Sequence, residues 1–132
     1  MKYLLDTHAF LWTLLDDEQL SKKAAKVIQK PDNDIYVSVI TFWEISLKHA
    51  IGKLELTGIS PDELPQKAKE TGIQTLKLTA QEAASFHRLP KLKHKDPFDR
   101  IIIWQAINAN LTLISKDKEI EKYTQHGLKT LW

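Results

Sequence analysis

Short apolar runs alternate with helical patterns along this chain, and this alternation restricts its fold more than any other feature of the sequence. Five runs have the composition of strands, at residues 3–5, 35–39, 74–78, 111–115 and 129–132. Strands that alternate with helices form βαβ units, in which the strands are parallel and helices cover the sheet. The sequence therefore predicts an α/β fold with a central parallel sheet. With 132 residues, we expect a single domain spanning residues 1–132.

The ends of the predicted helices are marked by capping residues. Ser60 and Thr79 each begin a capping-box pattern, with a glutamate three positions later. Gly52, Gly72 and Gly127 each follow a helical pattern and suit a left-handed C-terminal cap. Only one of the four glycines remains. Neither the Rossmann nor the P-loop motif for nucleotide binding is therefore present.

Composition excludes several classes of site. The chain has no cysteine, which excludes disulfides and thiolate metal sites and permits a reducing compartment. No run approaches the ~20 apolar residues of a membrane span, and no signal-like stretch develops before Asp6. We therefore expect a cytoplasmic protein without a membrane partner. The net charge of +2 is too small to identify a partner.

A group of lysines lies in residues 91–97, the stretch with the most loop-like composition. Lys91, Lys93 and Lys95 flank His94 there. They form either a solvated loop or a patch that contacts phosphate groups. The sequence alone leaves both interpretations open.

Four acidic residues are the strongest candidates for a functional site. Asp6, Glu44, Asp99 and Asp117 each follow or adjoin an apolar run that is typical of a strand or of the start of a helix. In an open parallel sheet, ligands bind beyond the carboxyl ends of the strands, so acids that follow different strands can converge on one crevice. Such a cluster is what a metal-dependent site for phosphodiester cleavage requires.

Each acid, taken alone, also has a purely structural interpretation at the start of a helix, where side chains accept hydrogen bonds from the backbone and the helix dipole favours negative charge. The candidates are Asp6 or Thr7 for the first helix, Thr41 with Glu44 as a capping box, Asp96 for the helix that contains Asp99, and Asp117 for the last helix. Capping alone does not explain acids that lie on the apolar face of a helix.

Two of the acids occupy such apolar stripes. Glu44 shares its stripe with Ile40, Leu47 and Ile51, and Asp99 shares its own with Ile102, Ile103 and Ala106. These faces should turn toward the sheet, so both carboxylates are expected to be at least partly buried. Two carboxylates ~4 Å apart repel by ~4 kcal/mol at an effective dielectric of ~20. We expect no lysine or arginine on either stripe near the acids. The sequence therefore predicts that Mg²⁺ or Mn²⁺ neutralises the carboxylates.

A cation of this kind polarises a phosphodiester and activates a water molecule, which makes hydrolysis of a nucleic acid the predicted chemistry. No nucleophilic side chain is needed. No serine of the chain has a histidine and an aspartate recognisably arranged around it. His8 and His94 adjoin candidate acids and are candidates for a direct role in catalysis or metal binding.

Four segments of the chain resemble the PIN domains of VapC-type toxins. They are LLDTHAFLW at 4–12, FWEISLK at 42–48, HKDPFDRIIIWQA at 94–106 and TLISKD at 112–117. The resemblance covers nearly the whole chain, and the motifs occur in the order found in that family. It implies a three-layer α/β/α fold with strand order 3-2-1-4-5, and a metal-dependent endoribonuclease activity on RNA.

The resemblance also implies roles for individual residues and the identity of partners. The residues that match the catalytic and metal-binding acids of the family are Asp6, Glu44, Asp99 and Asp117. Those expected near the substrate are Thr7, His94, Asp96, Arg100 and Ser115. The family further implies a cognate antitoxin, a segment of which occupies the cleft, and a homodimer.

Two other functions remain open from the sequence. A phosphohydrolase of the haloacid-dehalogenase kind also begins with an aspartate after its first strand, but it needs a second acid two residues later, where this chain has His8. A non-catalytic PIN-like module that binds RNA or a protein partner is expected to lack one of the acids, and this chain has all four.

Overall fold

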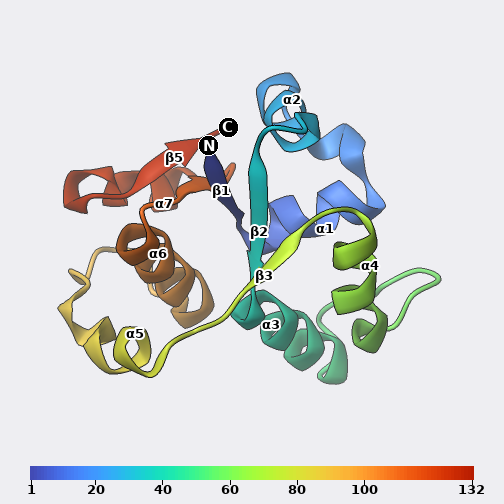
Figure 1. The fold of residues 1–132 in the computed structure, drawn as a ribbon. Helices are drawn as coiled ribbons and strands as arrows, with labels where there is room; N and C mark the ends of the chain where they lie inside the picture. The colour runs from blue at the N-terminus through green and yellow to red at the C-terminus, as the bar shows by residue number, and fades with distance from the viewer.

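The sheet at the centre of the protein has the predicted topology. The computed structural model describes all of residues 1–132, and its five strands are parallel, in the order β3-β2-β1-β4-β5 (Figure 1). The strands are β1 (Lys2–Leu5), β2 (Asp34–Ser38), β3 (Gln74–Leu76), β4 (Thr112–Ile114) and β5 (Lys129–Leu131). The predicted fold class and strand order are confirmed, and the predicted strand ends differ by only one or two residues.

Helices cover both faces of this sheet. The α-helices are α1 (Thr7–Leu15), α2 (Lys22–Gln29), α3 (Val39–Ala50), α4 (Leu64–Glu70), α5 (Ala80–Ser85), α6 (Pro97–Ala109) and α7 (Lys118–Glu121). Short 3-10 helices lie at Asp17–Gln19, Pro61–Glu63, Phe86–Arg88 and Lys122–His126. Helices α1, α2 and α4 lie on one side of the sheet, and α5, α6 and α7 lie on the other (Figure 1).

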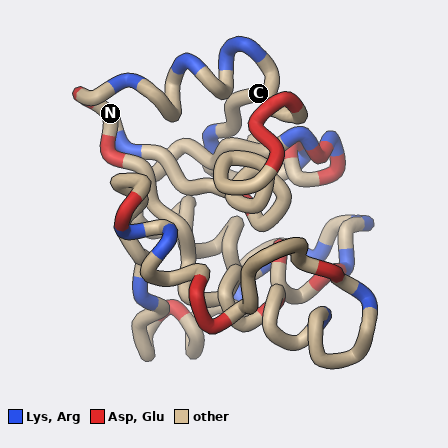
Figure 2. Tube along the Cα trace, turned by 90° about the vertical axis from the view of Figure 1, so that its right-hand side faces the viewer, with Lys and Arg blue, Asp and Glu red and all other residues tan.

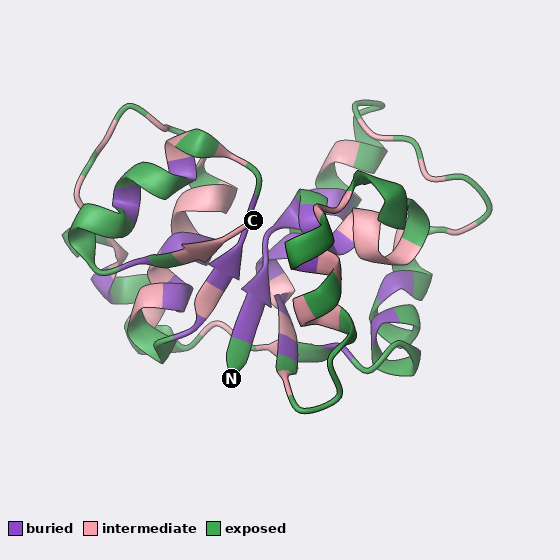
Figure 3. Ribbon diagram, turned by 90° about the horizontal axis from the view of Figure 1, so that it is seen from above, coloured by how far each residue is buried: buried purple, intermediate pink, exposed green.

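The strands carry apolar residues at consecutive positions because each of their two faces packs against a helical layer. In β1, Tyr3 and Leu5 belong to the core beneath α1, α2 and α4, whereas Leu4 belongs to the core beneath α6. Leu4 and Leu5 are both completely buried. Figure 3 shows these buried strand segments between helices whose outer surfaces are exposed. The three-layer arrangement follows directly from the apolar character of the strands.

The start of α3 differs from the prediction. The proposed capping box placed Thr41 before the helix, but α3 begins at Val39, and Ser38 is its N-cap. The Ser38 hydroxyl accepts a hydrogen bond from the backbone N–H of Ile40 at 3.0 Å, so the chain passes from β2 into α3 without a loop. Thr41 lies inside the helix and does not cap it. Its hydroxyl lies 3.2 Å from the hydroxyl of Thr7. The capping box predicted at Thr79 is present.

Left-handed backbone conformations end several helices. Gly52, Gly72 and Gly127 have positive φ angles, as predicted for residues that follow a helix. Asn110 also has a positive φ, at 55°, and it ends α6. Asparagine tolerates this conformation better than most residues. This helix end gave no glycine signal in the sequence.

A buried hydrogen bond joins the two halves of the fold. The Ser38 hydroxyl donates to Oε1 of Gln105 at 2.5 Å, and both residues are completely buried. Ser38 precedes α3 and Gln105 lies in α6, which are the helices that carry Glu44 and Asp99. The bond therefore fixes the relative positions of two helices that carry candidate site residues.

The structure contains no helix with the length and hydropathy that a membrane span requires.

We expect Ser38→Ala to lower the free energy of unfolding by about 1–3 kcal/mol, because it leaves the buried Gln105 carbonyl without a donor. The matched control is Ser46→Ala, at an exposed position of α3, the helix that Ser38 caps, which should change stability by no more than about 0.5 kcal/mol. Chemical denaturation of the two variants and the wild type measures the difference. Equal stability of all three proteins would contradict the role assigned to the Ser38 hydroxyl.

Candidate active site

Three of the four predicted acids line one hollow at the carboxyl ends of the central strands. Its volume is about 210 Å³. We call it the acidic hollow, and its lining consists of Asp6, His8, Trp12, Asp99, Lys116 and Asp117. The acids come from α6 and from the residues that immediately precede α1 and α7. Segments more than 90 residues apart in the chain are thereby brought together, as the sequence predicted.

Asp6 is fixed by the start of α1. It follows β1 directly, and its Oδ1 accepts a hydrogen bond from the backbone N–H of Ala9 at 2.8 Å. Burial raises the pKa of the Asp6 carboxyl, and the negative charge of Asp117 raises it further. The hydroxyl of Ser115, the N–H of Ala9 and the charge of His8 act in the opposite direction but do not outweigh burial. Asp6 is therefore both a helix cap and an incompletely compensated buried acid.

Asp99 lies in the first turn of α6, where Asp96 is the N-cap and Pro97 the first helical residue. Burial raises the pKa of Asp99 to about 6, and the nearby charge of Asp96 adds to this effect. A hydrogen bond from His94, with 2.9 Å between Nε2 and Oδ2, lowers the pKa but only in part. Asp96 itself accepts hydrogen bonds from the N–H groups of Phe98 and Asp99. It caps the helix, as predicted, and it also contributes negative charge to the site.

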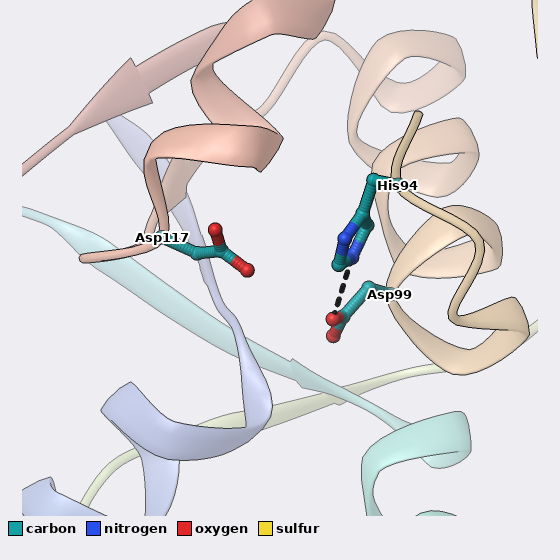
Figure 4. A group of neighbouring side chains, drawn as sticks. All are labelled: His94, Asp99 and Asp117. Atoms are coloured by element: carbon teal, nitrogen blue, oxygen red, sulfur yellow. Dashed lines mark hydrogen bonds and ion pairs between the residues drawn. The ribbon is translucent and has the colours of Figure 1, made fainter. Parts of the chain in front are cut away.

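Asp117 completes the group from the other side of β1. It caps α7, and its Oδ1 accepts a hydrogen bond from the N–H of Glu119 at 2.8 Å. Its own N–H donates to the Ser115 hydroxyl at 3.1 Å. Figure 4 shows the side chains of Asp117, His94 and Asp99 pointing toward a shared space between α7 and α6. One potential ligand atom from each of these three residues lies within 4.8 Å of the others.

Glu44 is buried beside the acidic hollow but does not line it. Its Oε1 accepts a hydrogen bond from the Thr7 hydroxyl at 2.6 Å, and its Oε2 pairs with Nζ of Lys48 at 2.5 Å. Burial alone would lower the pKa of Lys48, but Glu44 and the charges of Asp96 and Asp99 raise it overall. The expectation that no lysine lies near the acids was therefore wrong. Lys48 stands four residues after Glu44, on the same helical face.

The apolar stripe predicted for α3 is also only partly correct. Ile40 is buried, but Leu47 and Ile51 are 40% and 57% exposed. Their helix extends beyond the edge of the sheet, so only its first half has a core to pack against (Figure 1). The stripe of Asp99 is correct, since Ile102, Ile103 and Ala106 are all buried.

Arg100 and the lysines of residues 91–97 lie outside the lining of the acidic hollow. The Arg100 guanidinium donates to the backbone carbonyls of Leu89 and Pro90 and to the Tyr123 hydroxyl. It also stacks at 4.9 Å from the ring centroid of Phe86. These contacts give Arg100 a structural role in holding the segment before α6. Lys91, Lys93 and Lys95 are exposed.

The donor set of the acidic hollow suits a hard divalent cation. Asp6, Asp99 and Asp117 line the hollow and supply carboxylate oxygens, and His94, which is not part of the lining, adds an imidazole nitrogen close to Asp99 and Asp117. The raised pKa values of Asp6 and Asp99 indicate negative charge that the protein does not fully neutralise. Ligands on opposite sides of Mg²⁺ are ~4.2 Å apart, from metal–oxygen distances of 2.0–2.1 Å. One ligand atom each from His94, Asp99 and Asp117 lies within 4.8 Å of the others, which is close to this spacing, so these three residues fit the ion.

Three residues beside the acids were not predicted from the sequence. Lys48 could have been found from its spacing of four residues from Glu44. Trp12 is one helical turn after His8, within the first segment that resembles the family, and Lys116 is adjacent to Asp117. Only the tertiary structure places Trp12 and Lys116 together in the wall of the acidic hollow.

Comparison with known proteins places the fold and the sequence in one group. Ribonuclease VapC22 of Mycobacterium tuberculosis is 27% identical over 129 residues, which cover 98% of this chain and 97% of the relative. A solved structure of VapBC2 from Rickettsia felis, bound to a DNA fragment from its promoter, matches with a TM-score of 0.67 at 14% identity, covering 99% of this chain and 98% of the other.

A further solved structure is that of VapBC-5 from Mycobacterium tuberculosis, described as a member of the VapBC family of toxin-antitoxin systems. It matches with a TM-score of 0.61 at 16% identity and covers 98% of this chain and 97% of the other. The family model of the PIN domain matches residues 3–125. This match includes all four acids and confirms the resemblance stated from the motifs, and the chain accordingly belongs to the PIN domain family.

Proposed function

We propose that this protein is a metal-dependent endoribonuclease and the toxin of a toxin–antitoxin pair. The observation that carries the proposal is the convergence of Asp6, Asp99 and Asp117 on one hollow in which the pKa values of two of these carboxyls are raised. Membership of the PIN family and the ribonuclease name of a relative of nearly the same length support it.

The cation, Mg²⁺ or Mn²⁺, is proposed to be held by Asp6, Asp99 and Asp117, directly or through water. When bound, it supplies charge neutralisation for a phosphodiester and activation of a water molecule. His94 holds the Asp99 carboxylate in place through its hydrogen bond. With a pKa of about 6, Asp99 is mostly ionised at neutral pH and therefore available as a ligand.

Glu44 is proposed to belong to the site as an ion pair with Lys48 and not as a primary metal ligand. Both of its oxygens are engaged, one by Thr7 and the other by Lys48. A cation that binds Glu44 therefore competes with the positive charge of Lys48 for its carboxylate. The Ser115 hydroxyl orients Asp117 through the backbone N–H of that residue. Thr7 and Ser115, predicted near the substrate, are thus proposed to position the acids.

An antitoxin partner and a homodimer complete the proposal. Relatives of this fold were solved as VapBC proteins, one of them described as a member of a toxin–antitoxin family. The protein also exposes apolar side chains one turn apart, at Trp43 and Leu47 of α3 and at Ile51, the residue that follows this helix. Contiguous exposed apolar surface is typical of sites that a protein partner covers.

Replacement of a hollow carboxylate tests the activity. Asp6→Asn and Asp99→Asn should each reduce cleavage of cellular RNA in Mg²⁺ by more than the ~10- to 100-fold typical of residues that only orient ligands. Asp62→Asn, at an exposed position outside the acidic hollow, is the control and should cleave at the wild-type rate. The assay is the rate of RNA fragment formation. Full cleavage by a folded Asp6→Asn variant would show that the site assignment is wrong.

Metal binding should be visible as thermal stabilisation. At a Mn²⁺ or Mg²⁺ concentration of ~100 times the dissociation constant, mass action stabilises the wild type by ~2.7 kcal/mol. The melting temperature of Asp99→Asn should rise much less, because one ligand oxygen has lost its charge. Asp62→Asn should match the wild type. Equal shifts in all three proteins would refute a cation site in the acidic hollow.

The raised pKa of Asp99 predicts how the stability of the metal-free protein depends on pH. Between pH 3.8 and about 6 the unfolded chain has released a proton that folded Asp99 retains. Rising pH then favours unfolding, so the free energy of unfolding falls across that window. Above the window, the destabilisation by ionised Asp99 has reached its full size. Asp6 acts in the same direction.

With a chelator present, the wild type should therefore lose stability relative to Asp99→Asn as the pH rises from 4 to 7. Melting temperatures of both proteins at several pH values, compared as a difference, isolate this contribution. A difference that does not change with pH would contradict the raised pKa.

A further inference from the structure

One part of the wall of the acidic hollow is aromatic. His8 and Trp12 lie one turn apart on α1, with ring centroids 5.6 Å apart and an angle of 35° between the rings. Trp12 also contacts Trp132, the last residue of the chain, with 5.8 Å between the two ring centroids. Nζ of Lys116 is 5.9 Å from the centroid of the Trp12 ring. Trp12, His8 and Lys116 all line the hollow beside the acids.

A purely structural role accounts poorly for Trp12. Its neighbours Leu11 and Leu14 pack against the core on their side of the sheet, and so does Trp132. Trp12 belongs to neither core cluster and is only half-buried. Its aromatic ring is held by Trp132 and His8, and it contributes to the surface of the hollow instead of to the interior.

The charge distribution of the protein requires local contacts with an RNA substrate. The net charge is only +2, and Figure 2 shows that basic and acidic residues are interspersed along the chain. The three carboxylates of the hollow repel a phosphate group in the absence of a cation. Long-range attraction is therefore weak, and binding beside the acids depends on contacts that do not rely on net charge.

Aromatic side chains supply such contacts, because every nucleobase has a face that stacks on an indole ring. An unpaired base of RNA exposes that face. A lysine close to the ring adds a cation that can pair with the backbone phosphate of the stacked nucleotide. Lys116 adjoins Asp117 in the chain, and its Nζ lies over the Trp12 ring, within reach of a nucleotide that binds there.

We propose that Trp12, supported by His8 and Trp132, is a stacking platform for an unpaired nucleobase next to the phosphodiester at the acids, and that Lys116 contacts the phosphate of that nucleotide. This subsite rests on the proposed ribonuclease function and adds to it a specific positioning of the substrate. Trp12 is a binding and positioning residue that aligns the chain of the RNA with the carboxylates.

Binding measurements with two probes separate stacking from charge. The probes are a short 5′-labelled oligoadenylate and an abasic ribose-phosphate oligomer of the same length and charge, titrated with the full-length protein in Mg²⁺ and followed by fluorescence anisotropy. Trp12→Leu should weaken oligoadenylate binding by about 5- to 150-fold, which is the ~1–3 kcal/mol of one stacked base converted at 1.4 kcal/mol per factor of ten. Trp12→Phe should recover part of this loss.

The controls distinguish stacking from general damage. Trp12→Leu and the wild type should bind the abasic oligomer equally weakly. Leu15→Ala shortens an apolar side chain that is 44% exposed on α1 and lies outside the hollow, and it should bind oligoadenylate as the wild type does. Equal oligoadenylate binding by the wild type and a folded Trp12→Leu variant overturns the platform, as does a wild type that binds neither probe.

Cleavage assays keep this inference separate from the proposed function. A wild type that binds oligoadenylate through Trp12 but cleaves no cellular RNA would leave the platform in place and refute the ribonuclease. A wild type that cleaves RNA no faster than Trp12→Leu at subsaturating RNA would refute the platform and leave the ribonuclease in place.

Discussion

The parallel pairing of β1 with both β2 and β4 is the constraint on which the acidic site depends. The register aligns Leu5 with Val37 on one side and with Ile114 on the other. The residues that follow these strands therefore emerge at one edge of the sheet. The chain builds β2 and β3 on one side of β1 and then adds β4 and β5 on the opposite side. Asp6 and Asp117 flank the point where this direction changes, which is where ligands bind in open parallel sheets.

Electrostatic compensation divides the four acids into two kinds. Glu44 has a lysine and a threonine hydroxyl on its two oxygens, so its buried charge is neutralised within the protein. Asp6 and Asp99 have raised pKa values because burial and neighbouring carboxylates outweigh their hydrogen bonds. Uncompensated charge at one place in a folded protein costs stability. Such an arrangement is consistent with a site whose counter-charge comes from a bound cation.

The sequence predicted the parts of this structure that depend on local chemistry. Apolar runs located the strands, and Thr79 located a helix start, because periodicity and capping act within a few residues. The strand order came from the family resemblance. Contacts between distant segments were not predictable: Thr41 faces Thr7 instead of capping a helix, and Arg100 donates to the backbone carbonyls of Leu89 and Pro90. The length of α3 beyond the sheet, which exposes Leu47 and Ile51, is likewise a tertiary property.

Helix capping and metal binding are compatible roles for the same carboxylate. Asp6 and Asp117 each use Oδ1 to accept a hydrogen bond from a backbone N–H in the following helix. This bond fixes the side-chain rotamer, and it uses only one of the ~4 lone-pair sites of the carboxylate, so others remain for a cation. A carboxylate held in this way loses less conformational entropy when a cation binds than a mobile one does. In this architecture the start of a helix beside a strand end thus provides both the position of the acid and its rigidity.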